Sequence, residues 1–356
     1  MDGFDLSFYA GKRVFVTGHT GFKGSWLCRL LVRAGADVTG YSLAPPTSPS
    51  LYEIAGIAQD VRAVTGDIRD YGALKAAFDA AQPEIVFHLA AQPIVREGYK
   101  NPADTYGINV MGTVNILECI RSSRCARSFL NVTSDKAYMN REWARGYRES
   151  DALDGFDPYS SSKSCSELVT RCYRDSFFAD GRVAVSTARA GNVIGGGDFA
   201  PNRIMPDCVR ASLKREPVVV RNPLSTRPYQ HVLEALYAYL MIAAMQQQDR
   251  RYAGSYNVGP DDADCCTTGA LAELFVRSWG EGMTWLDRRE GGPREAGCLR
   301  LDCTKLKETF GWRPRWNLQT AVDKVVEWSR CWAAGGDVRA LMDAQMDAFL
   351  KAGESR

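Results

Sequence analysis

Short apolar runs alternate with stretches of helical periodicity through the first half of the chain. The apolar runs are rich in β-branched and aromatic residues, which favour strands, and the stretches between them repeat apolar residues every three or four positions, as amphipathic helices do. The predicted strands cover residues 13–17, 37–41, 61–65, 85–89, 129–133 and 183–189, and the predicted helices cover residues 22–34, 71–81, 105–121 and 158–178. This alternation predicts the α/β class, with a doubly wound, Rossmann-type parallel sheet, helices on both faces and right-handed crossovers.

The second half of the chain is less regular. Three consecutive glycines at positions 195–197 interrupt it after the sixth predicted strand. Further helices are predicted at 206–215, 232–247, 268–279 and 318–334, and a further strand at 255–258. A length of 356 residues indicates two domains, at roughly 150 residues each. We expect the first domain to cover 1–190, with 230–258 returning to it, and a smaller mixed α/β domain to cover 191–229 and 259–356.

Composition narrows the class of partner. The chain is 45% hydrophobic and 24% charged, which is ordinary for a globular protein. Its 44 basic and 42 acidic residues nearly cancel, which argues against nucleic acid or a membrane surface as a partner. We expect no secretory signal and no membrane span, because no apolar run approaches the roughly 20 residues that a span needs. Eleven cysteines without Cys-x-x-Cys spacing predict free thiols in a reducing cytoplasm, and three scattered histidines argue against a metal site.

The loop between the first predicted strand and the first predicted helix gives the first chemical signal. Gly18, Gly21 and Gly24 recur at every third position, around Thr20 and Phe22. Glycines allow a tight turn and bring backbone N–H groups against a pyrophosphate at the start of a helix. Structural turns also produce this spacing, but its position between a strand and a helix predicts a dinucleotide cofactor.

The ends of the next strands bear on which dinucleotide is bound. An acid that binds the adenosine ribose is expected after the second strand, but residues 40–43 read Gly-Tyr-Ser-Leu. No Arg or Lys follows to hold a 2′-phosphate, so NAD is predicted rather than NADP. Asp67 and Ile68 are predicted to bracket the adenine, the alternative for Asp67 being a helix cap before Tyr71. His88 is predicted to be a packed strand histidine rather than a catalyst. Small residues after it are predicted to let the cofactor cross the sheet edge: Leu89, Ala90 and Ala91.

A second signal combines hydroxyl and amine groups. Tyr159 and Lys163 lie one helical turn apart. A Lys beside a Tyr stabilises the phenolate and lowers a pKa that is ordinarily about 10, which would make Tyr159 a usable proton carrier for alcohol oxidation. The Tyr-x-x-x-Lys spacing also occurs on solvated helix faces. Here Ser134 follows the fifth predicted strand, at the sheet edge where ligands bind in this architecture, and is predicted to hydrogen-bond the reacting alcohol.

Several segments together resemble a known family. They are residues 17–26, 41–47, 88–93, 133–136, 159–163, 190–198 and 227–232, and they extend over most of the chain. These segments are similar to those of extended short-chain dehydrogenases/reductases that modify nucleotide sugars and, more narrowly, of the CDP-glucose 4,6-dehydratases. The resemblance implies an NAD-binding first domain and a second domain that binds the nucleotide sugar. It implies conversion of CDP-glucose to CDP-4-keto-6-deoxyglucose, a step toward deoxysugars of bacterial surface polysaccharides.

The resemblance also implies roles for individual residues. Tyr159 would take the proton of the sugar 4-hydroxyl, while Lys163 holds the nicotinamide ribose and Ser134 orients the oxygen. Lys136 is placed to remove the proton on carbon 5, and Asp135 to protonate the departing 6-hydroxyl. Sibling dTDP-glucose dehydratases have Glu at the position of Lys136, and a Lys must lose its charge before it can act as a base. The alternative is that Lys136 stays charged, stabilises the enolate and leaves proton removal to water.

The same resemblance assigns residues of the second domain to the nucleotide and its diphosphate: Asn192, Arg203, Arg227, Asn257 and Arg294. Arginine suits phosphate because its planar guanidinium group donates two hydrogen bonds at once. The family also implies a homo-oligomer, a dimer or a dimer of dimers, that pairs through predicted helices 105–121 and 158–178.

Other hypotheses remain at this stage. A nucleotide-sugar 4-epimerase would share the glycine loop, Ser134, Tyr159 and Lys163, but it needs no further acid and base. A dehydratase of a dTDP-, GDP- or UDP-linked sugar would need the same residues as the CDP-glucose enzyme. An NAD-sensing binding protein on the same fold is more distant, because such proteins often lose the Tyr-x-x-x-Lys pair. Asp135 and Lys136 directly after Ser134 favour the dehydratase.

Overall fold

The computed structural model describes residues 4–289 and 296–354. Within them, one central parallel sheet has seven strands in the order β10-β6-β5-β4-β1-β2-β3. They are β1 (Arg13–Thr17), β2 (Asp37–Ser42), β3 (Arg62–Thr65), β4 (Ile85–His88), β5 (Ser128–Val132), β6 (Ala184–Ala190) and β10 (Ser255–Val258). The strand order reverses between β1 and β4, which leaves a crevice at their carboxyl ends, where ligands bind in doubly wound folds. The predicted Rossmann-type class is confirmed.

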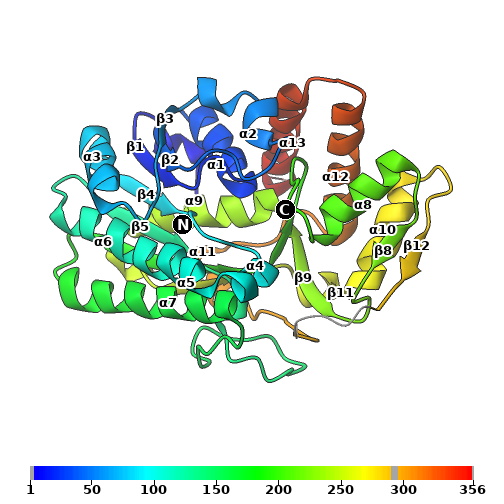
Figure 1. Ribbon diagram of the computed structural model, residues 1–356. Helices are drawn as coiled ribbons and strands as arrows, with labels where there is room; N and C mark the ends of the chain where they lie inside the picture. The colour runs from blue at the N-terminus through cyan, green and yellow to red at the C-terminus, as the bar shows by residue number, and fades with distance from the viewer. Residues whose placement is uncertain (1–3, 290–295, 355–356) are drawn as a thin grey trace.

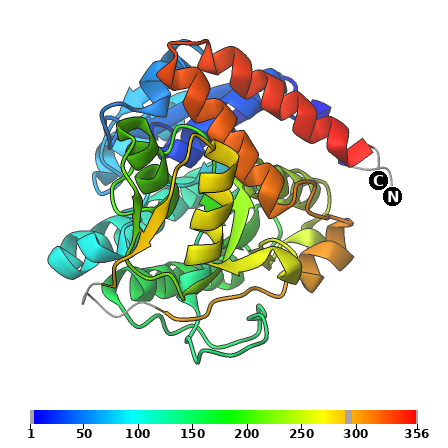
Figure 2. The same cartoon turned by 90° about the vertical axis from the view of Figure 1, so that its right-hand side faces the viewer.

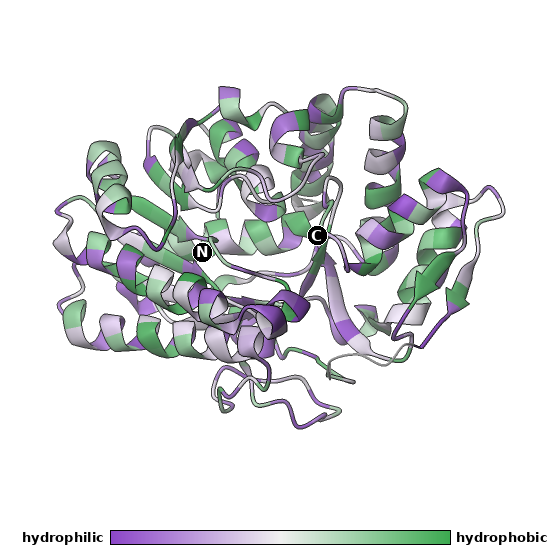
Figure 3. Ribbon diagram, in the orientation of Figure 1, coloured by the Kyte–Doolittle hydropathy of each residue, from purple (hydrophilic) through white to green (hydrophobic). Residues whose placement is uncertain are grey.

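Helices cover both faces of this sheet (Figure 1). Alternate side chains of a strand point to opposite faces, so Val14 and Val16 of β1 join one buried cluster while Phe15 joins another. The first cluster includes residues of α1 (Phe22–Arg33), α9 (Val232–Gln248) and α13 (Val338–Glu354), and the second includes residues of α3 (Tyr71–Ala81) and α6 (Gly112–Ser122). Figure 3 shows the central strands mostly in the green of hydrophobic residues, whereas the outer helices carry purple on their free faces.

A smaller region lies beside the carboxyl edge of the sheet and faces the viewer in Figure 2. It contains a three-stranded sheet of β7 (Asn192–Ile194), β9 (Thr226–His231) and β11 (Cys265–Thr267), and a two-stranded sheet of β8 (Val218–Val220) and β12 (Trp285–Asp287). Its own hydrophobic cluster draws on α8 (Ile204–Lys214), α10 (Thr268–Trp279) and α12 (Leu318–Ala333). The remaining helices are α2 (Leu51–Ile54), α4 (Val95–Lys100), α5 (Pro102–Tyr106), α7 (Pro158–Phe177) and α11 (Thr304–Phe310).

The structure corrects part of the predicted element list. The single helix predicted over 105–121 is α5, a π-helical turn at Gly107–Met111 and α6. The short strands β7, β8, β9, β11 and β12 and the helix α13 were not predicted. Strand β10 pairs with β6, and Met342 and Met346 of α13 share a hydrophobic cluster with α1. The exact division of the chain into two domains stays a prediction. Among the described residues, no helix has the length and apolar character to cross a membrane.

Candidate active site

The segment that follows β5 carries three of the predicted catalytic groups. Ser134 caps a short 3-10 helix, Asp135–Ala137, by accepting a hydrogen bond from the backbone N–H of Lys136 at 3.2 Å. Its hydroxyl donates to Oδ1 of Asp135 at 3.0 Å, and the same oxygen lies 3.3 Å from Nζ of Lys136. Asp135 is 1% exposed, and within the described part of the chain its Oδ2 has no hydrogen-bond partner. The segment therefore places a hydroxyl and an amine against the same oxygen of one buried carboxylate.

The first turn of α7 supplies the phenol and the second amine. Asp157 caps this helix by accepting from the N–H of Ser160 at 3.0 Å, and Pro158 occupies its first turn. Tyr159 is buried and shares a hydrogen bond with Ser134. Lys163, one turn later, is 5% exposed. The Ser, Tyr and Lys groups that are far apart in sequence thus meet at the carboxyl edge of the sheet, as the pattern predicted.

The electrostatics of this pair differ from the expectation. Burial raises the pKa of Tyr159 to about 12, and the Asp135 carboxylate acts in the same direction. The prediction that Lys163 lowers the tyrosine pKa is wrong for this structure, because Nζ of Lys163 donates to the carbonyl of Val132 at 3.2 Å. Burial lowers the pKa of Lys163 itself to about 8, partly opposed by the charge of Glu167. In the protein without ligands, the phenol is therefore held in its neutral form.

Lys23 is a third amine at this site, and it was not among the residues predicted from sequence. It lies in the first turn of α1, half-buried, with no hydrogen bond or ion pair among the described residues. Burial lowers its pKa to about 7, and the nearby charges of Lys163 and Arg203 add to this effect. The sequence held a signal, since Lys23 is the one Lys or Arg among residues 17–24, which contain the glycine loop. Its position beside other cations favours an anionic ligand.

The glycine loop fits the pyrophosphate of a dinucleotide. Gly18 has φ +77°, and a Cβ there would lie 2.7 Å from the backbone nitrogen of Ala90. A Cβ on Gly24 would lie 2.1 Å from the carbonyl oxygen of Gly18, so α1 packs too closely on the loop for a side chain. Gly21 caps α1 without any side-chain hydrogen bond, and Phe22 begins the helix. The N–H groups of the first turn are therefore free to bind an anion.

The adenosine end of the predicted cofactor site is built from hydroxyl groups. Thr20 Oγ1 lies 2.8 Å from the Ser42 hydroxyl and donates to the carbonyl of Leu43 at 3.0 Å. This pair of hydroxyls lies at the end of β2, where an acidic residue was expected to bind the adenosine ribose but is absent from the sequence. Asp67 does not cap α3, because Asp70 does so, through the N–H of Ala73. Asp67 instead forms an ion pair with Arg69 at 2.7 Å, and Ile68 is buried.

The turn after β4 lies against the glycine loop. Thr17 Oγ1 accepts hydrogen bonds from the N–H groups of Leu89 and Ala90, both at 3.2 Å, while Ala91 follows half-buried. His88 is 2% exposed, with Nδ1 at 2.7 Å from the same hydroxyl and its ring stacked on a phenylalanine of β5. The prediction of a packed histidine is confirmed.

Asn109 joins this region to α7. It occupies the π-helical turn, is 1% exposed, and donates through Nδ2 to the Ser162 hydroxyl at 2.8 Å and to the carbonyl of Gln92 at 3.1 Å. Its Oδ1 accepts from the N–H of Gln92 at 2.8 Å. A π-helical turn widens a helix by one residue and often marks a functional region. The sequence analysis missed this residue, since apolar periodicity does not reveal such a turn.

The residues assigned to the nucleotide sugar are dispersed. Arg203 lies near Tyr159 and Lys23 and pairs with Asp198 at 2.9 Å. Asn192 and Arg227 lie on the neighbouring strands β7 and β9. Asn192 Oδ1 is buried and has no partner in the described structure.

Arg227 is 5% exposed and donates to the carbonyls of Thr226, Ala296 and Gly297 at 2.9, 2.5 and 3.4 Å. Asn257 is fully buried in a different network, where its amide contacts Tyr138 and two backbone carbonyls and is committed to these partners. It is not brought together with the catalytic groups. Arg294 lies outside the described residues.

Comparisons with known proteins give a consistent result. The sequence profile of the family described as GDP-mannose 4,6 dehydratase matches residues 15–325. A CDP-glucose 4,6-dehydratase of Salmonella typhimurium is 44% identical over 98% of this chain and 99% of its own.

Two solved structures share the fold at low identity. The UDP-glucose 4-epimerase of Thermotoga maritima has a TM-score of 0.77 at 22% identity, covering 89% of this chain and 98% of its own. The dTDP-glucose 4,6-dehydratase of Bacillus anthracis, in complex with NAD, has a TM-score of 0.74 at 19% identity, covering 89% of this chain and 96% of its own. The profile match over most of the chain and the 44% identity together show that this chain belongs to the GDP-mannose 4,6 dehydratase family.

Proposed function

We propose that this protein converts CDP-glucose to CDP-4-keto-6-deoxyglucose and uses NAD that it regenerates in each cycle. The observation that carries the proposal is the contact of the buried Asp135 carboxylate with the Ser134 hydroxyl and with the Lys136 amine. Oxidation of a sugar alcohol needs only Ser134, Tyr159 and Lys163, whereas removal of water needs a further acid and a further base. The 44% identical relative from Salmonella is named as an enzyme of this activity, which supports CDP-glucose as the substrate.

The oxidising groups are assigned as follows. Tyr159 takes the proton of the sugar 4-hydroxyl, and Ser134 holds the oxygen by the hydroxyl that now contacts the phenol. Bound NAD supplies the chemistry of taking hydride from carbon 4 and returning it to carbon 6. Its positive nicotinamide ring is expected to lower the tyrosine pKa that burial raises.

The eliminating groups are Asp135 and Lys136. At 3.3 Å the two can exchange a proton, and the resulting carboxylic acid and neutral amine are the forms that elimination needs. Lys136 then removes the proton on carbon 5 while Asp135 protonates the departing 6-hydroxyl. This step returns the pair to its charged form, and Lys136 can give a proton back to carbon 5. The pair is then one proton short, and the proton that Tyr159 took from the 4-hydroxyl has to pass back to it to close the cycle. In net terms the sugar loses one water, made from its 6-hydroxyl and the proton of its 4-hydroxyl.

The cofactor site supports NAD rather than NADP. The Thr20 and Ser42 hydroxyls suit a ribose, and neither residue offers a charge for a 2′-phosphate. Lys23 and the N–H groups of the first turn of α1 suit the pyrophosphate. Calorimetric titration of cofactor-free protein tests this assignment, and tighter binding of NADP than of NAD would contradict it.

One panel of assays separates the candidate functions. The purified protein is mixed with NAD and with CDP-, dTDP-, GDP- or UDP-glucose, and the products are followed by ketone absorbance in alkali and by nuclear magnetic resonance. A 4-keto-6-deoxy product made fastest from CDP-glucose is the expected result. A galacto-configured product would identify an epimerase, and binding of NAD without turnover of any sugar would identify a sensor. Faster turnover of another nucleotide sugar would move the assignment to that sugar.

We further propose that two copies pair through α6 and α7. Apolar side chains are exposed on α7 and on the π-helical turn that leads into α6: Leu168 of α7 is 43% exposed, and Met111 of that turn is 52% exposed. Burial of such residues favours association. A monomeric mass at micromolar concentration in analytical ultracentrifugation would contradict the proposal.

A further inference from the structure

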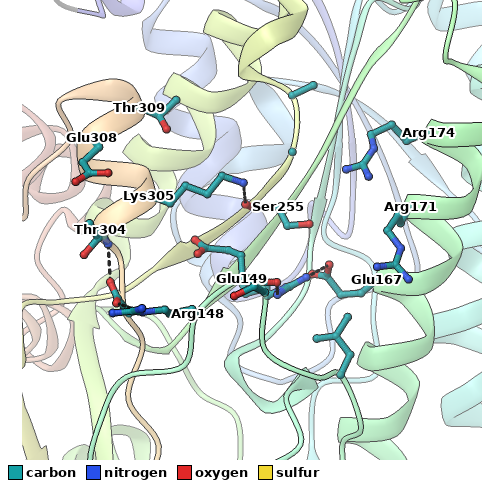
Figure 4. Close-up of a pocket in the computed structure, with 16 residues that line it drawn as sticks. Arg148, Glu149, Glu167, Arg171, Arg174, Ser255, Thr304, Lys305, Glu308 and Thr309 are labelled. Atoms are coloured by element: carbon teal, nitrogen blue, oxygen red, sulfur yellow. Dashed lines mark hydrogen bonds and ion pairs between the residues drawn. The ribbon is translucent and has the colours of Figure 1, made fainter.

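A cavity of about 860 Å³ lies on the side of α7 that faces β10 and α11. Figure 4 shows α7 contributing Glu167, Arg171 and Arg174 to it, with Lys305 on the opposite side. Arg189 of β6 also lines the cavity and forms an ion pair with Glu167 at 2.9 Å. Both members of this pair are almost fully buried, Glu167 at 2% and Arg189 at 3% exposure. The function proposed above assigns nothing to them.

Glu167 joins α7 to two strands. Its Oε1 accepts a hydrogen bond from the hydroxyl of Thr133 at the end of β5. Its Oε2 accepts from the hydroxyl of Thr187 in β6 at 2.8 Å and from Arg189 at 2.9 Å. Thr133 immediately precedes Ser134, so this carboxylate holds the chain at the entrance to the catalytic segment 134–137.

Arg189 holds the other end of the same segment. Its Nη1 donates to the hydroxyl of Tyr138 at 2.8 Å and to the carbonyl of Glu149 at 3.2 Å. The guanidinium group also lies 5.0 Å from the centre of the Tyr138 ring. The tyrosine hydroxyl donates onward to Asn257 at 2.6 Å. Tyr138 immediately follows Ala137, so the two partners of one ion pair contact the residues on either side of the catalytic segment.

The same face of α7 adds a second attachment to β5. Lys163 lies one turn before Glu167 and donates to the carbonyl of Val132 at 3.2 Å. Val132 and Thr133, the two residues before Ser134, are thus both hydrogen-bonded to α7, Val132 through its carbonyl and Thr133 through its hydroxyl. Tyr159 lies on α7 and Ser134 follows β5. Attachments that fix α7 against β5 therefore also restrict the separation of Tyr159 and Ser134.

We propose that the Glu167–Arg189 ion pair is a positioning element that fixes both ends of segment 134–137 and thereby sets Ser134 against Tyr159 and Lys136 against the sugar. The inference rests on the proposed function, because it concerns the reaction that those groups perform. A buried ion pair is weak evidence of stability by itself, since desolvation opposes the attraction. Its placement at the two ends of one functional segment is what indicates positioning.

The test removes one hydroxyl at a time and leaves the ion pair in place. Thr133→Val and Tyr138→Phe each remove one of the contacts to the segment. Thr187→Val removes a hydroxyl from the same carboxylate on β6, a strand without a catalytic group, and Tyr147→Phe removes a buried hydroxyl from a ring stacked on Tyr138. Thr133→Ser restores the hydroxyl. All variants are measured as full-length protein with NAD, for kcat, KM and melting temperature.

The expected result is a selective loss of kcat. Thr133→Val should lower kcat by roughly 10-fold to 100-fold with KM within about twofold, because small displacements of reacting groups reduce rates by such factors. Tyr138→Phe should slow exchange of the carbon 5 hydrogen with deuterated water more than it slows oxidation, because Lys136 is nearer to that end. Thr133→Ser should recover most of the rate. Thr187→Val and Tyr147→Phe should change kcat by less than about threefold.

A kcat that falls equally in Thr133→Val and Thr187→Val would overturn the proposal, as would a fall in melting temperature without a change in kcat in Thr133→Val and Tyr138→Phe. The series is run on whichever nucleotide sugar the native protein converts fastest. A wrong substrate assignment therefore appears in the native protein, whereas a failure of the positioning role appears only in the comparison between variants.

Discussion

The catalytic edge of the sheet and the smaller region beside it hold their functional side chains in different ways. At the edge, Lys163 is bound to the carbonyl of Val132 in β5, and Ser134 is bound to the carboxylate of Asp135. In the smaller region, Arg203 is bound to Asp198, and Arg227 to three carbonyl oxygens. Fixed groups suit chemistry, which needs exact geometry before the substrate arrives. Arg203, whose side chain is 34% exposed and is paired with one carboxylate, suits capture, because a diphosphate can replace that partner, whereas the buried Arg227 is held as firmly as Lys163.

The largest effect is expected from Tyr159→Phe, which removes one of the fixed groups at the catalytic edge. Loss of one acid–base group should lower kcat by roughly 10²-fold to 10⁴-fold. NAD affinity should stay within about threefold, because the glycine loop and the first turn of α1 are untouched. Steady-state kinetics and calorimetric titration of NAD provide the two measurements. Near-native turnover would remove the phenol from the mechanism.

The second change separates two fixed groups that lie 3.3 Å apart. Lys136→Ala should permit oxidation at carbon 4 and stop exchange of the carbon 5 hydrogen with deuterated water, lowering overall turnover by about 10²-fold or more. Asp135→Asn should also stall turnover but should slow that exchange less than Lys136→Ala does, because the amine remains although it loses the carboxylate that takes its proton. Mass spectrometry of recovered sugar distinguishes them. Native-like exchange in Lys136→Ala would reassign the lysine to stabilising the enolate charge.

A smaller effect is expected where the partner is exchangeable. Arg203→Gln should raise KM for the nucleotide sugar by about 10-fold, the loss expected when one charge-assisted contact to a phosphate is removed. Its kcat should change less than its KM. Arg221→Gln is the matched control, because Arg221 binds Asn202 and Asp207 in the same region. A drop in kcat with an unchanged KM would place Arg203 among the fixed groups instead.

The smallest effect concerns the cost of holding Lys23 at the catalytic edge. Burial lowers its pKa from 10.5 to about 7, so between these values the unfolded chain binds more protons and stability rises with pH. Lys23→Met removes the ammonium. The cofactor-free variant should therefore melt about 2 °C higher than the native protein below pH 7, and the difference should vanish above about pH 10. Thermal scans across this range would contradict the assignment by showing a constant difference.

The regular part of the fold was accessible from sequence because each element there buries one apolar face. Val14 and Val16 alternate with Phe15, and this pattern alone identifies a strand covered on both sides. Strand β9 lacks that signal, since it is polar and contains Pro228, a residue that argues against a strand. The helix α13 did carry a signal, in the spacing of Met342, Met346 and Phe349, which the analysis did not use.

Part of the candidate site could be predicted from sequence, namely the residues that are close together in sequence or lie at the ends of strands. Segment 134–136 and the pair Tyr159 and Lys163 follow from such positions, because the carboxyl ends of parallel strands share one edge. The direction of the tyrosine pKa did not follow, since burial depends on the whole fold rather than on the neighbouring lysine. The partners of Asn257 could not be predicted either, because its hydrogen bonds come from segments 45 to 119 residues away, which no local pattern encodes.

The π-helical turn at Gly107–Met111 restricts where the chain can lose or gain a residue. A turn with one residue more than an α-helix sets the rotation of everything that follows, at about 100° per residue. Deleting one residue here would turn the apolar face of α6 away from the sheet or return Asn109 to a regular helical direction, away from Gln92 and Ser162. Surface loops tolerate the deletion of single residues. We expect the length of this turn, in contrast, to be the same in all homologues that keep the activity.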